Sequence, residues 1–385
     1  MSHDTDSGRL SAAPRSDVQD FAARTGRVRV HMTGSAWFSA TPGGLNRYFT
    51  DLYCALRSRS DVDVSAVAFG EPAPGGRSWG PVGGSTRRRV RASLVENPPL
   101  PHQAVVDRHF CLYGRPVVGR RGRHPVVVHF HGPWAAESRI AGSGEAAARA
   151  KYCLERIRYS GADRYVVLST CFQDVLVDRY RVPPSRIRLI PPGVDLDRFR
   201  LLERSRSPST MVLCVRRLER RMGVDVLLRS WPGVLASQPD ARLVIVGTGS
   251  EEAALRAQVA ESRLGGTVSF EGRVGDARLA QLYGESALTV VPSVALEGFG
   301  LIALESLAAG RAPVVTDCGG LPDSVRGLDP SLVVPAGDPD ALANRLVDGL
   351  HGRVPGPRRC REHAETFSWQ ATAAQHVEMY TELLA

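Results

Sequence analysis

The sequence predicts an α/β protein that contains two doubly wound parallel sheets, each covered by helices on both faces. From Arg27 onward, apolar runs of strand length alternate with segments of helical period, which is the pattern of such sheets. The chain has 385 residues, a length that favours two hydrophobic cores over one. A polar, proline-bearing stretch at 191–209 precedes a fresh apolar strand, so we place the domain boundary there.

These boundaries divide the chain into four parts. The first is a polar lead without the apolar segment of a secretory signal, and the last is an amphipathic helix that we expect to pack across the first domain. The parts are the lead at 1–26, the first domain at 27–205, the second domain at 206–366 and the crossing helix at 367–385.

In the first domain, Val28–Met32 is the expected first strand. The loop Thr41-Pro42-Gly43-Gly44 leads from it into an amphipathic helix, and Val62–Phe69 is the next strand. Residues 70–125 are rich in Gly, Pro and Arg, so we predict irregular structure there. Further strands are expected at 126–131, 165–168 and 187–190, with helices at 144–160 and directly after Ser169.

The second domain has a more regular pattern. Strands are expected at 211–215, 243–247, 267–270, 287–291, 313–316 and 332–334, with helices between them. In open α/β sheets ligands bind at the carboxyl ends of the strands, and the motifs described below lie at such ends.

The positive charge of the chain comes almost entirely from arginine. The formal net charge is +9, and Lys151 is the single lysine. The basic clusters are Arg87, Arg88, Arg89 and Arg91, and then Arg115, Arg120, Arg121 and Arg123. No aromatic interleaving accompanies them, so we expect no nucleic-acid partner and interpret them as a solvated face or a peripheral contact with an anionic membrane.

Cysteine content and hydropathy bear on location. The seven cysteines are scattered and contain no C-x-x-C pair, which favours a reducing cytoplasm. No stretch approaches the ~18 uninterrupted apolar residues of a membrane span. We therefore predict a cytoplasmic protein.

The most informative motif is the run from Glu297 to Glu305, which follows a strand and opens a helix. Its glycines, Gly298 and Gly300, leave backbone N–H groups accessible to bind an anion at the positive end of that helix. Diphosphate is the ligand that we expect there. Glu305 lies about two turns beyond Glu297, so the two carboxylates suit two separate sets of hydroxyls. One ligand carrying sugar, diphosphate and ribose satisfies this layout.

Two further motifs lie at strand ends. The segment 215–225 carries arginines suited to bind the phosphates of such a ligand. His129 and His131 lie on one side of the strand at 126–131. Two histidines can bind a metal, but no further His, Asp or Cys follows at ligand spacing, so we predict no metal.

The run from Glu297 to Glu305, with the later Gly319-Gly320-Leu321-Pro322, resembles the donor site of retaining glycosyltransferases of family 4. The resemblance implies the GT-B fold, in which two Rossmann-like domains face a cleft. The first domain then binds the acceptor and the second the nucleotide sugar. The resemblance also implies that Glu297 approaches the donor-sugar hydroxyls and that Glu305 holds the ribose. The intervening groups expected at the diphosphate or sugar are Gly298, Phe299, Gly300 and Leu301.

The resemblance extends to other positions. It implies that Arg217 binds the leaving group, whereas Met222 stands where the family has a lysine, so we expect Arg221 to substitute. His131 aligns with the histidine that approaches the donor sugar. Gly43 and Gly44 resemble the glycine-rich loop near donor phosphate and acceptor, and Arg273 and Val274 resemble the segment that meets the nucleotide base.

These observations predict a retaining, metal-independent glycosyltransferase without a cofactor. It moves a sugar from a UDP- or GDP-sugar to a hydroxyl of a small molecule, in antibiotic or other secondary-metabolite biosynthesis. A cationic, aminoglycoside-like acceptor would meet Glu96, Asp107 or Glu137. The alternatives are a glycolipid or cell-envelope polysaccharide glycosyltransferase and a nonhydrolysing sugar-nucleotide epimerase.

Overall fold

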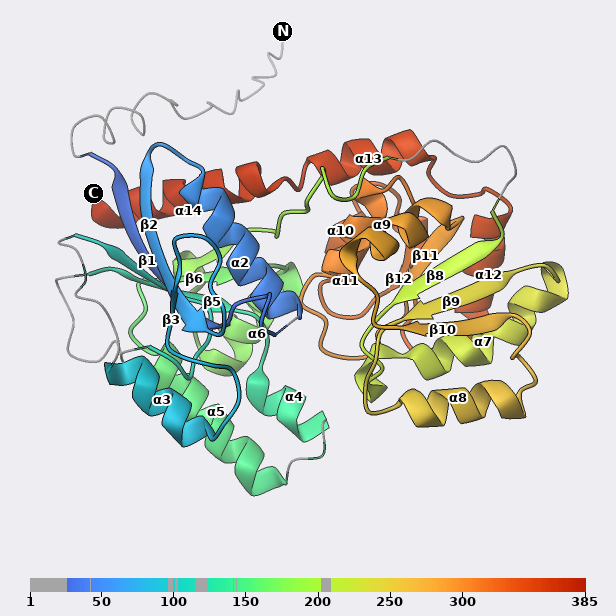
Figure 1. Ribbon diagram of the computed structural model, residues 1–385, viewed down its shortest axis with the longest axis horizontal. Coiled ribbons are helices and arrows are strands. Elements are labelled where there is room, and N and C mark those ends of the chain that lie inside the picture. Colours follow the sequence, from blue (N-terminus) through green and yellow to red (C-terminus); the bar gives the residue numbers. More distant parts are fainter. Residues whose placement is uncertain are drawn as a thin grey trace, which may run out of the picture.

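The computed structural model describes residues 26–41, 43–95, 100, 103–114, 124–140, 142, 144–201 and 209–385. Within them lie the two predicted parallel-sheet domains, side by side along the long axis of the molecule (Figure 1). The polar lead before residue 26, the second arginine cluster and residues 202–208 of the interdomain stretch fall outside this description.

The first domain is built on a seven-stranded sheet in the order β3-β2-β1-β4-β5-β6-β7. Each neighbouring pair is parallel, so the connections cross over, and most of them contain helices. The strands are β1 (Val28–Ala36), β2 (Val62–Phe69), β3 (Arg77–Ser78), β4 (Val105–Arg108), β5 (Val126–Phe130), β6 (Arg164–Val167) and β7 (Ile187–Leu189). The helices are α2 (Gly44–Arg57), α3 (Thr86–Val95), α4 (Trp134–Ile140), α5 (Glu145–Tyr159), α6 (Thr170–Tyr180) and the 3-10 turn η1 (Pro184–Arg186).

The second domain is built on a six-stranded parallel sheet in the order β10-β9-β8-β11-β12-β13. Its strands are β8 (Met211–Val215), β9 (Arg242–Val246), β10 (Val268–Gly272), β11 (Leu288–Val291), β12 (Pro313–Thr316) and β13 (Val333–Val334). Its helices are η2 (Arg220–Met222), α7 (Val224–Ser237), α8 (Glu252–Glu261), α9 (Asp276–Glu285), α10 (Leu301–Ala308), α11 (Leu321–Val325), η3 (Pro330–Leu332), α12 (Pro339–Leu350) and α13 (Pro357–Glu365).

The prediction of irregular structure at 70–125 is wrong for much of the described part. β3, α3 and β4 lie there, and β4 occupies the middle of the first sheet, between β1 and β5. The strand reads V-V-D-R, and both Asp107 and Arg108 are buried. Buried parallel strands are recognised by continuous apolar runs, and two charged residues in four interrupt that signal.

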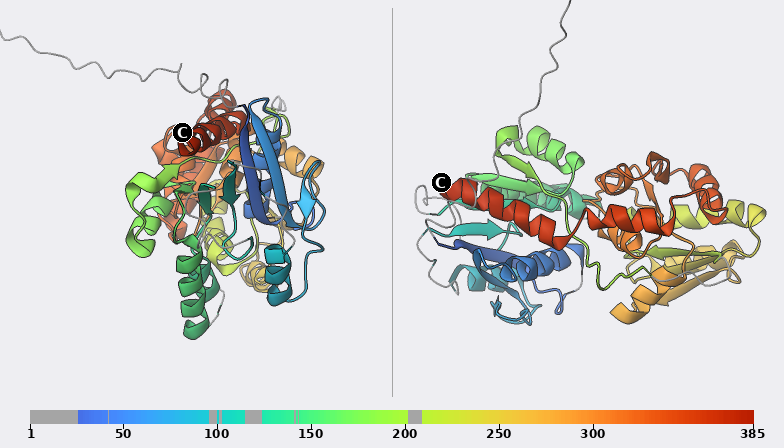
Figure 2. Two further views of the ribbon diagram at one scale, coloured as in Figure 1. Left: turned by 90° about the vertical axis from the view of Figure 1, so that its left-hand side faces the viewer. Right: turned by 90° about the horizontal axis from the view of Figure 1, so that it is seen from above.

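The predicted crossing helix is α14 (Trp369–Leu384), which lies along the first domain (Figures 1 and 2). It packs against α2, β1 and β4. Gly193 of the interdomain stretch lies against its first turn, where an added Cβ would be 2.6 Å from the Cα of Trp369. Only glycine permits that approach. No helix among the described residues is long and apolar enough to cross a membrane.

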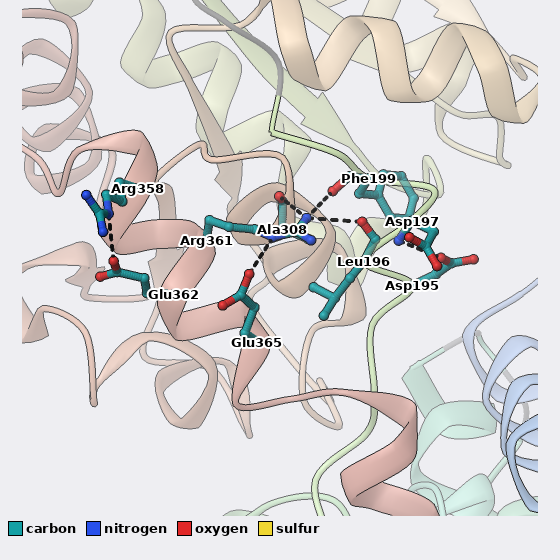
Figure 3. Close-up of polar contacts among 9 residues, drawn as sticks. All are labelled: Asp195, Leu196, Asp197, Phe199, Ala308, Arg358, Arg361, Glu362 and Glu365. Atoms are coloured by element: carbon teal, nitrogen blue, oxygen red, sulfur yellow. Dashed lines mark hydrogen bonds and ion pairs between the residues drawn. The ribbon is translucent and has the colours of Figure 1, made fainter.

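Arg361 of α13 ties the interdomain stretch to the second domain (Figure 3). Its Nη1 donates to the backbone oxygens of Leu196, Phe199 and Ala308 at 3.1, 2.9 and 3.0 Å. Ala308 is the last residue of α10. One guanidinium therefore joins the linker to the helix that carries Glu305.

Candidate functional site

The segment from Glu297 to Glu305 forms the turn and helix expected from the sequence. Gly300 is the N-cap of α10 and has a φ of 91°, which suits glycine. Leu296, just before the motif, has a φ of 51°, a left-handed conformation that bulky side chains rarely adopt and that marks functional turns. Gly300 has no side chain to cap the helix, so the first-turn N–H groups are suited to bind an anion.

The turn between β12 and α11 packs directly on this segment. The Gly320 N–H donates to the Glu297 carbonyl at 2.9 Å. A Cβ added at Gly319 would lie 2.1 Å from the Glu297 oxygen, and one at Gly320 would lie 2.1 Å from the Gly298 oxygen. The two glycines therefore allow a backbone contact that fixes the position of Glu297.

Arg216 is the arginine that the fold brings to Glu297. Its side chain is 5% exposed and forms an ion pair with Glu297 Oε2, whose side chain is 15% exposed. The same Nη2 donates to Ser293 Oγ and lies 2.8 Å from Met222 Sδ, while Ser293 donates to Glu297 Oε2 at 3.2 Å. Burial raises the pKa of Glu297, but the neighbouring Arg216 outweighs it, so the pKa lies below its ordinary value. Glu297 is therefore a carboxylate at neutral pH.

Arg217 and Arg221, the two arginines that we expect at the leaving group, differ in their surroundings. The Arg217 side chain is exposed and makes no hydrogen bond or ion pair with another described residue, whereas its backbone oxygen accepts from the Glu219 N–H at 3.0 Å. Arg221 donates from Nη1 to the Leu296 carbonyl at 2.9 Å, so it supports the left-handed residue before Glu297. Met222, which stands where the family has a lysine, is buried beside Arg216.

Glu305 lies in the second turn of α10 and is buried. The Tyr283 hydroxyl donates to its Oε2 at 3.0 Å. Burial raises the pKa of Glu305, and the positive charges of Arg47 and Arg198 oppose this shift. Arg47 comes from α2, so the helix that begins at Gly44 lies near the second carboxylate.

The first domain meets the glycine turn at the junction between the domains. A Cβ at Gly298 would lie 3.2 Å from Phe172 Cε2 and 3.9 Å from the His131 carbonyl, and one at Gly44 would lie 3.9 Å from Leu301 Cδ1. Gly298 is half-buried and Gly300 is buried. The structure therefore brings the loop at Gly44, the strand end at His131 and the paired-glutamate motif to one place.

A carboxylate of the second domain caps a helix of the first at the same junction. Asp323 of α11 accepts hydrogen bonds from the N–H and hydroxyl of Thr170, at 2.9 and 3.0 Å, at the start of α6. Anionic groups are stabilised at a helix N-terminus. This contact holds the two domains together beside the turn at Gly298.

His131 directly follows β5 and lies beside a buried polar cluster that sequence reasoning did not foresee. His129 Nε2 lies 2.9 Å from Asp107 Oδ1, and His109 Nε2 lies 3.5 Å from Asp107 Oδ2. Tyr380 of α14 donates a hydrogen bond to Asp107. Burial lowers the pKa of His129 to about 4 and that of His131 well below its ordinary value, so both rings are neutral at pH 7.

This cluster is also the place where a metal has to be considered. The reason given above against a metal is wrong, because β4 brings Asp107 and His109 beside His129 and His131. One ring nitrogen from each histidine lies within 4.8 Å of the other two. The rings of His109 and His129 are stacked at 3.8 Å and 19°, so their in-plane lone pairs run nearly parallel instead of converging on one centre as metal ligands do. We interpret the cluster as packing support for His131.

The remaining predicted residues lie apart from these contacts. Arg273 and Val274 follow β10, an edge strand of the second sheet, and their role at the nucleotide base stays a prediction. Asp107 is fully buried, so the expectation that it contacts an acceptor is wrong. Glu96 and the side chain of Glu137 lie outside the described structure.

Sequence reasoning missed three side chains that hold the paired glutamates, namely Arg216, Ser293 and Tyr283. One signal was available for Arg216. Its N–H bonds the Val246 carbonyl at 2.9 Å and so extends the β8–β9 ladder. Strand alternation then points its side chain to the same face as buried Cys214.

Comparison with known proteins covers both domains. Residues 42–198 match the model for Glycosyltransferase Family 4, and residues 209–351 match the model for Glycosyl transferases group 1. The D-inositol 3-phosphate glycosyltransferase of Acidothermus cellulolyticus is 31% identical over 393 residues, covering 89% of this chain and 86% of that protein. A relative of the same name from Corynebacterium jeikeium is 33% identical, over 60% of this chain and 60% of that protein.

Solved structures share the fold at lower identity. Sucrose-phosphate synthase from Thermosynechococcus elongatus matches with a TM-score of 0.73 at 24% identity, covering 93% of this chain and 99% of that one. WaaG, a glycosyltransferase involved in lipopolysaccharide biosynthesis, matches with a TM-score of 0.70 at 18% identity, covering 91% and 99%. The two-domain arrangement is thus the GT-B fold. By its matches along both domains, the chain belongs to glycosyltransferase family 4 and is a glycosyltransferase that uses a nucleotide sugar.

Proposed function

We propose that this chain transfers a sugar from a UDP- or GDP-sugar to a hydroxyl of a small molecule, with retention of the anomeric configuration and without a metal. The observation that carries the proposal is the junction at which Glu297, the Gly298–Leu301 turn and Glu305 meet His131 and Gly44 of the other domain. One nucleotide sugar spans those groups. The HepE protein of Anabaena, solved in complex with UDP, has the same fold, with a TM-score of 0.67 at 16% identity, covering 92% of this chain and 100% of that one.

In the proposed reaction the bond from the anomeric carbon to the β-phosphate oxygen breaks, and the acceptor oxygen bonds to that carbon on the same face. The acceptor proton leaves with the departing nucleoside diphosphate, so the products are a glycoside and that nucleotide. Glu297 and His131 position the sugar, Glu305 binds the ribose, and the first-turn N–H groups of α10 face the diphosphate. Arg217 and Arg221 stabilise the charge that grows on the leaving group.

Nucleotide binding is tested by calorimetry with UDP. Glu305→Ala and Arg217→Ala should each weaken binding by roughly tenfold or more, because each removes a charged hydrogen-bonding group. Arg220→Ala is the matched control, since Arg220 is another exposed arginine of the same loop. Unchanged affinity in both test variants contradicts the assignment.

Turnover is tested by nucleotide release from a panel of UDP- and GDP-sugars, with and without acceptors. Proton NMR of the product establishes the anomeric configuration, and full activity after treatment with a chelator is expected. The epimerase alternative predicts a new nucleotide sugar from donor alone. Failure of every donor with every acceptor contradicts the proposed function.

For the acceptor, we propose a small polyhydroxylated molecule. The relatives named D-inositol 3-phosphate glycosyltransferase favour a cyclitol phosphate for the first round of the panel. Secondary-metabolite acceptors, including aminoglycoside-like ones, form the second round. We place the reaction in the cytoplasm, in keeping with seven unpaired cysteines.

A glycolipid acceptor is the second candidate, because Arg87, Arg88 and Arg91 lie exposed on α3. Cosedimentation with vesicles containing anionic lipid tests this alternative. Binding that disappears when these three arginines are replaced by glutamine supports the glycolipid, and absence of binding contradicts it.

A further inference from the structure

The guanidinium of Arg216 is buried beside Glu297, and the function proposed above gives it no role. Arg216 makes all its described side-chain contacts through Nη2, to Glu297 Oε2, Ser293 Oγ and Met222 Sδ. Its Nε is buried without a hydrogen-bond partner. An arginine so deeply buried is unfavourable unless a counter-charge compensates it, and Glu297 is the carboxylate that does so.

The contacts use one oxygen of Glu297. Oε2 accepts from both Arg216 and Ser293, and the Ser293 backbone oxygen accepts in turn from Thr316 Oγ1 at 2.6 Å. Oε1 takes no part in this arrangement. Two donors on one oxygen restrict rotation of the carboxylate, so its other oxygen, which lies outside these contacts, can accept hydrogen bonds from a ligand in a preferred direction.

The neighbour at 222 fits this interpretation. Met222 Sδ lies 2.8 Å from the guanidinium, so a charged amine extending from position 222 would stand directly beside a second cation. A neutral thioether is a weak acceptor and avoids that repulsion. Arg216 and Met222 therefore form one unit, in which Arg216 carries the positive charge and Met222 adds none.

We propose that Arg216 is a positioning residue for the donor sugar, which anchors Oε2 of Glu297 so that Oε1 binds the sugar hydroxyls, and that Met222 is neutral because this guanidinium stands beside it. The inference rests on the proposed function for the identity of the ligand. It adds a residue that acts through Glu297, in addition to the arginines proposed for the leaving group.

The first test needs no donor. Carbon-13 NMR of side-chain-labelled glutamate follows the Glu297 carboxyl, assigned with Glu297→Gln. In the wild type its titration is expected below the ordinary pKa of 4.5. Arg216→Met should move the titration above that value, and Arg216→Met combined with Met222→Lys should move it back, because the charge then comes from position 222. The idea is refuted if Arg216→Met leaves the titration in place.

The second test uses UDP and the nucleotide sugar identified in the donor screen. Arg216→Met is expected to lower kcat/KM for the nucleotide sugar by roughly 10- to 100-fold, the loss of a hydrogen bond to a charged group, while UDP affinity changes less than about threefold. Arg216→Lys should recover part of the loss, and Arg220→Met, which removes an exposed arginine of the same loop, is the matched control.

Three results of this second test would also overturn the proposal. If Arg216→Met weakens UDP binding by the same factor as it lowers kcat/KM for the nucleotide sugar, Arg216 binds the diphosphate directly. Additive losses for Arg216→Met and Glu297→Gln show that the two side chains act independently. Full turnover in Arg216→Met shows that the anchor is dispensable. If no nucleotide sugar is turned over by the wild type, the proposed function fails, whereas the NMR result still decides the Arg216–Glu297 relation.

Discussion

Arg361 offers the sharpest test of how the linker is held to the second domain. Its Nη1 donates to three backbone oxygens, those of Leu196, Phe199 and Ala308 (Figure 3). One nitrogen has two hydrogens, so the three contacts amount to about two full hydrogen bonds from a charged donor. At about 1.5 kcal/mol each, with a discount for a side chain that is 20% exposed, Arg361→Met should cost about 2–3 kcal/mol.

The same helix provides a matched control. Arg358 pairs with Glu362 as Arg361 pairs with Glu365, each four residues apart, but Arg358 is 90% exposed and contacts none of the three backbone oxygens. An exposed pair of this kind is worth about 0.3–0.5 kcal/mol, so Arg358→Met should have almost no effect. The difference between the two variants therefore isolates the carbonyl contacts.

Differential scanning calorimetry measures the outcome. A loss of 2–3 kcal/mol should lower Tm by roughly 4–12 °C, at about 2–4 °C per kcal/mol for domains of this size. UDP affinity should fall as well, because α10 carries Glu305. Equal changes in Tm for the two variants would refute the reasoning, since the carbonyl contacts would then contribute nothing beyond the surface ion pair.

Three further predictions concern Gly319 in the turn between β12 and α11, Tyr380 in the crossing helix α14, and Asp51 in helix α2. Gly319→Ala places a Cβ 2.1 Å from the Glu297 oxygen in a left-handed conformation, so UDP-sugar binding measured by calorimetry should weaken by at least tenfold, and unchanged binding would contradict the contact. Tyr380→Phe removes the hydrogen bond to buried Asp107 and should cost about 1.5–3 kcal/mol in urea unfolding, whereas a neutral change would show that α14 does not support the cluster. Burial raises the pKa of Asp51 to about 6, so between about pH 4 and 6 Asp51 is protonated in the folded protein but ionised in the unfolded chain. The stability of the folded protein therefore falls as pH rises through that window. Asp51→Asn should therefore raise stability at pH 8 by up to about 3 kcal/mol and leave it unchanged below pH 4, and equal effects at both values would argue against the raised pKa.

Much of the fold was predictable because its signals are local. The strand at Val62–Phe69 follows from apolar periodicity, and the start of the helix at Thr170 follows from the capping hydroxyl of Ser169. Both signals involve only residues that are close together in the sequence. The strand β4 was not predictable in this way. Its Asp107 is compensated by His129 and by Tyr380 from the crossing helix, and that compensation exists only after the chain has folded.

The paired glutamates illustrate the same division at the site. The glycines, the acids and their spacing are contiguous, so the sequence alone determined the turn and the helix start, and the ligand proposed for them rests on the same residues. Which arginine faces Glu297 was decided by tertiary structure. Arg216 and Arg217 are neighbours with the same chemistry, and the packing of β8 against β9 and β11 buries one beside Ser293 and leaves the other in solvent. Chain periodicity determines local geometry, whereas the partner of a buried charge depends on elements that lie far apart in sequence.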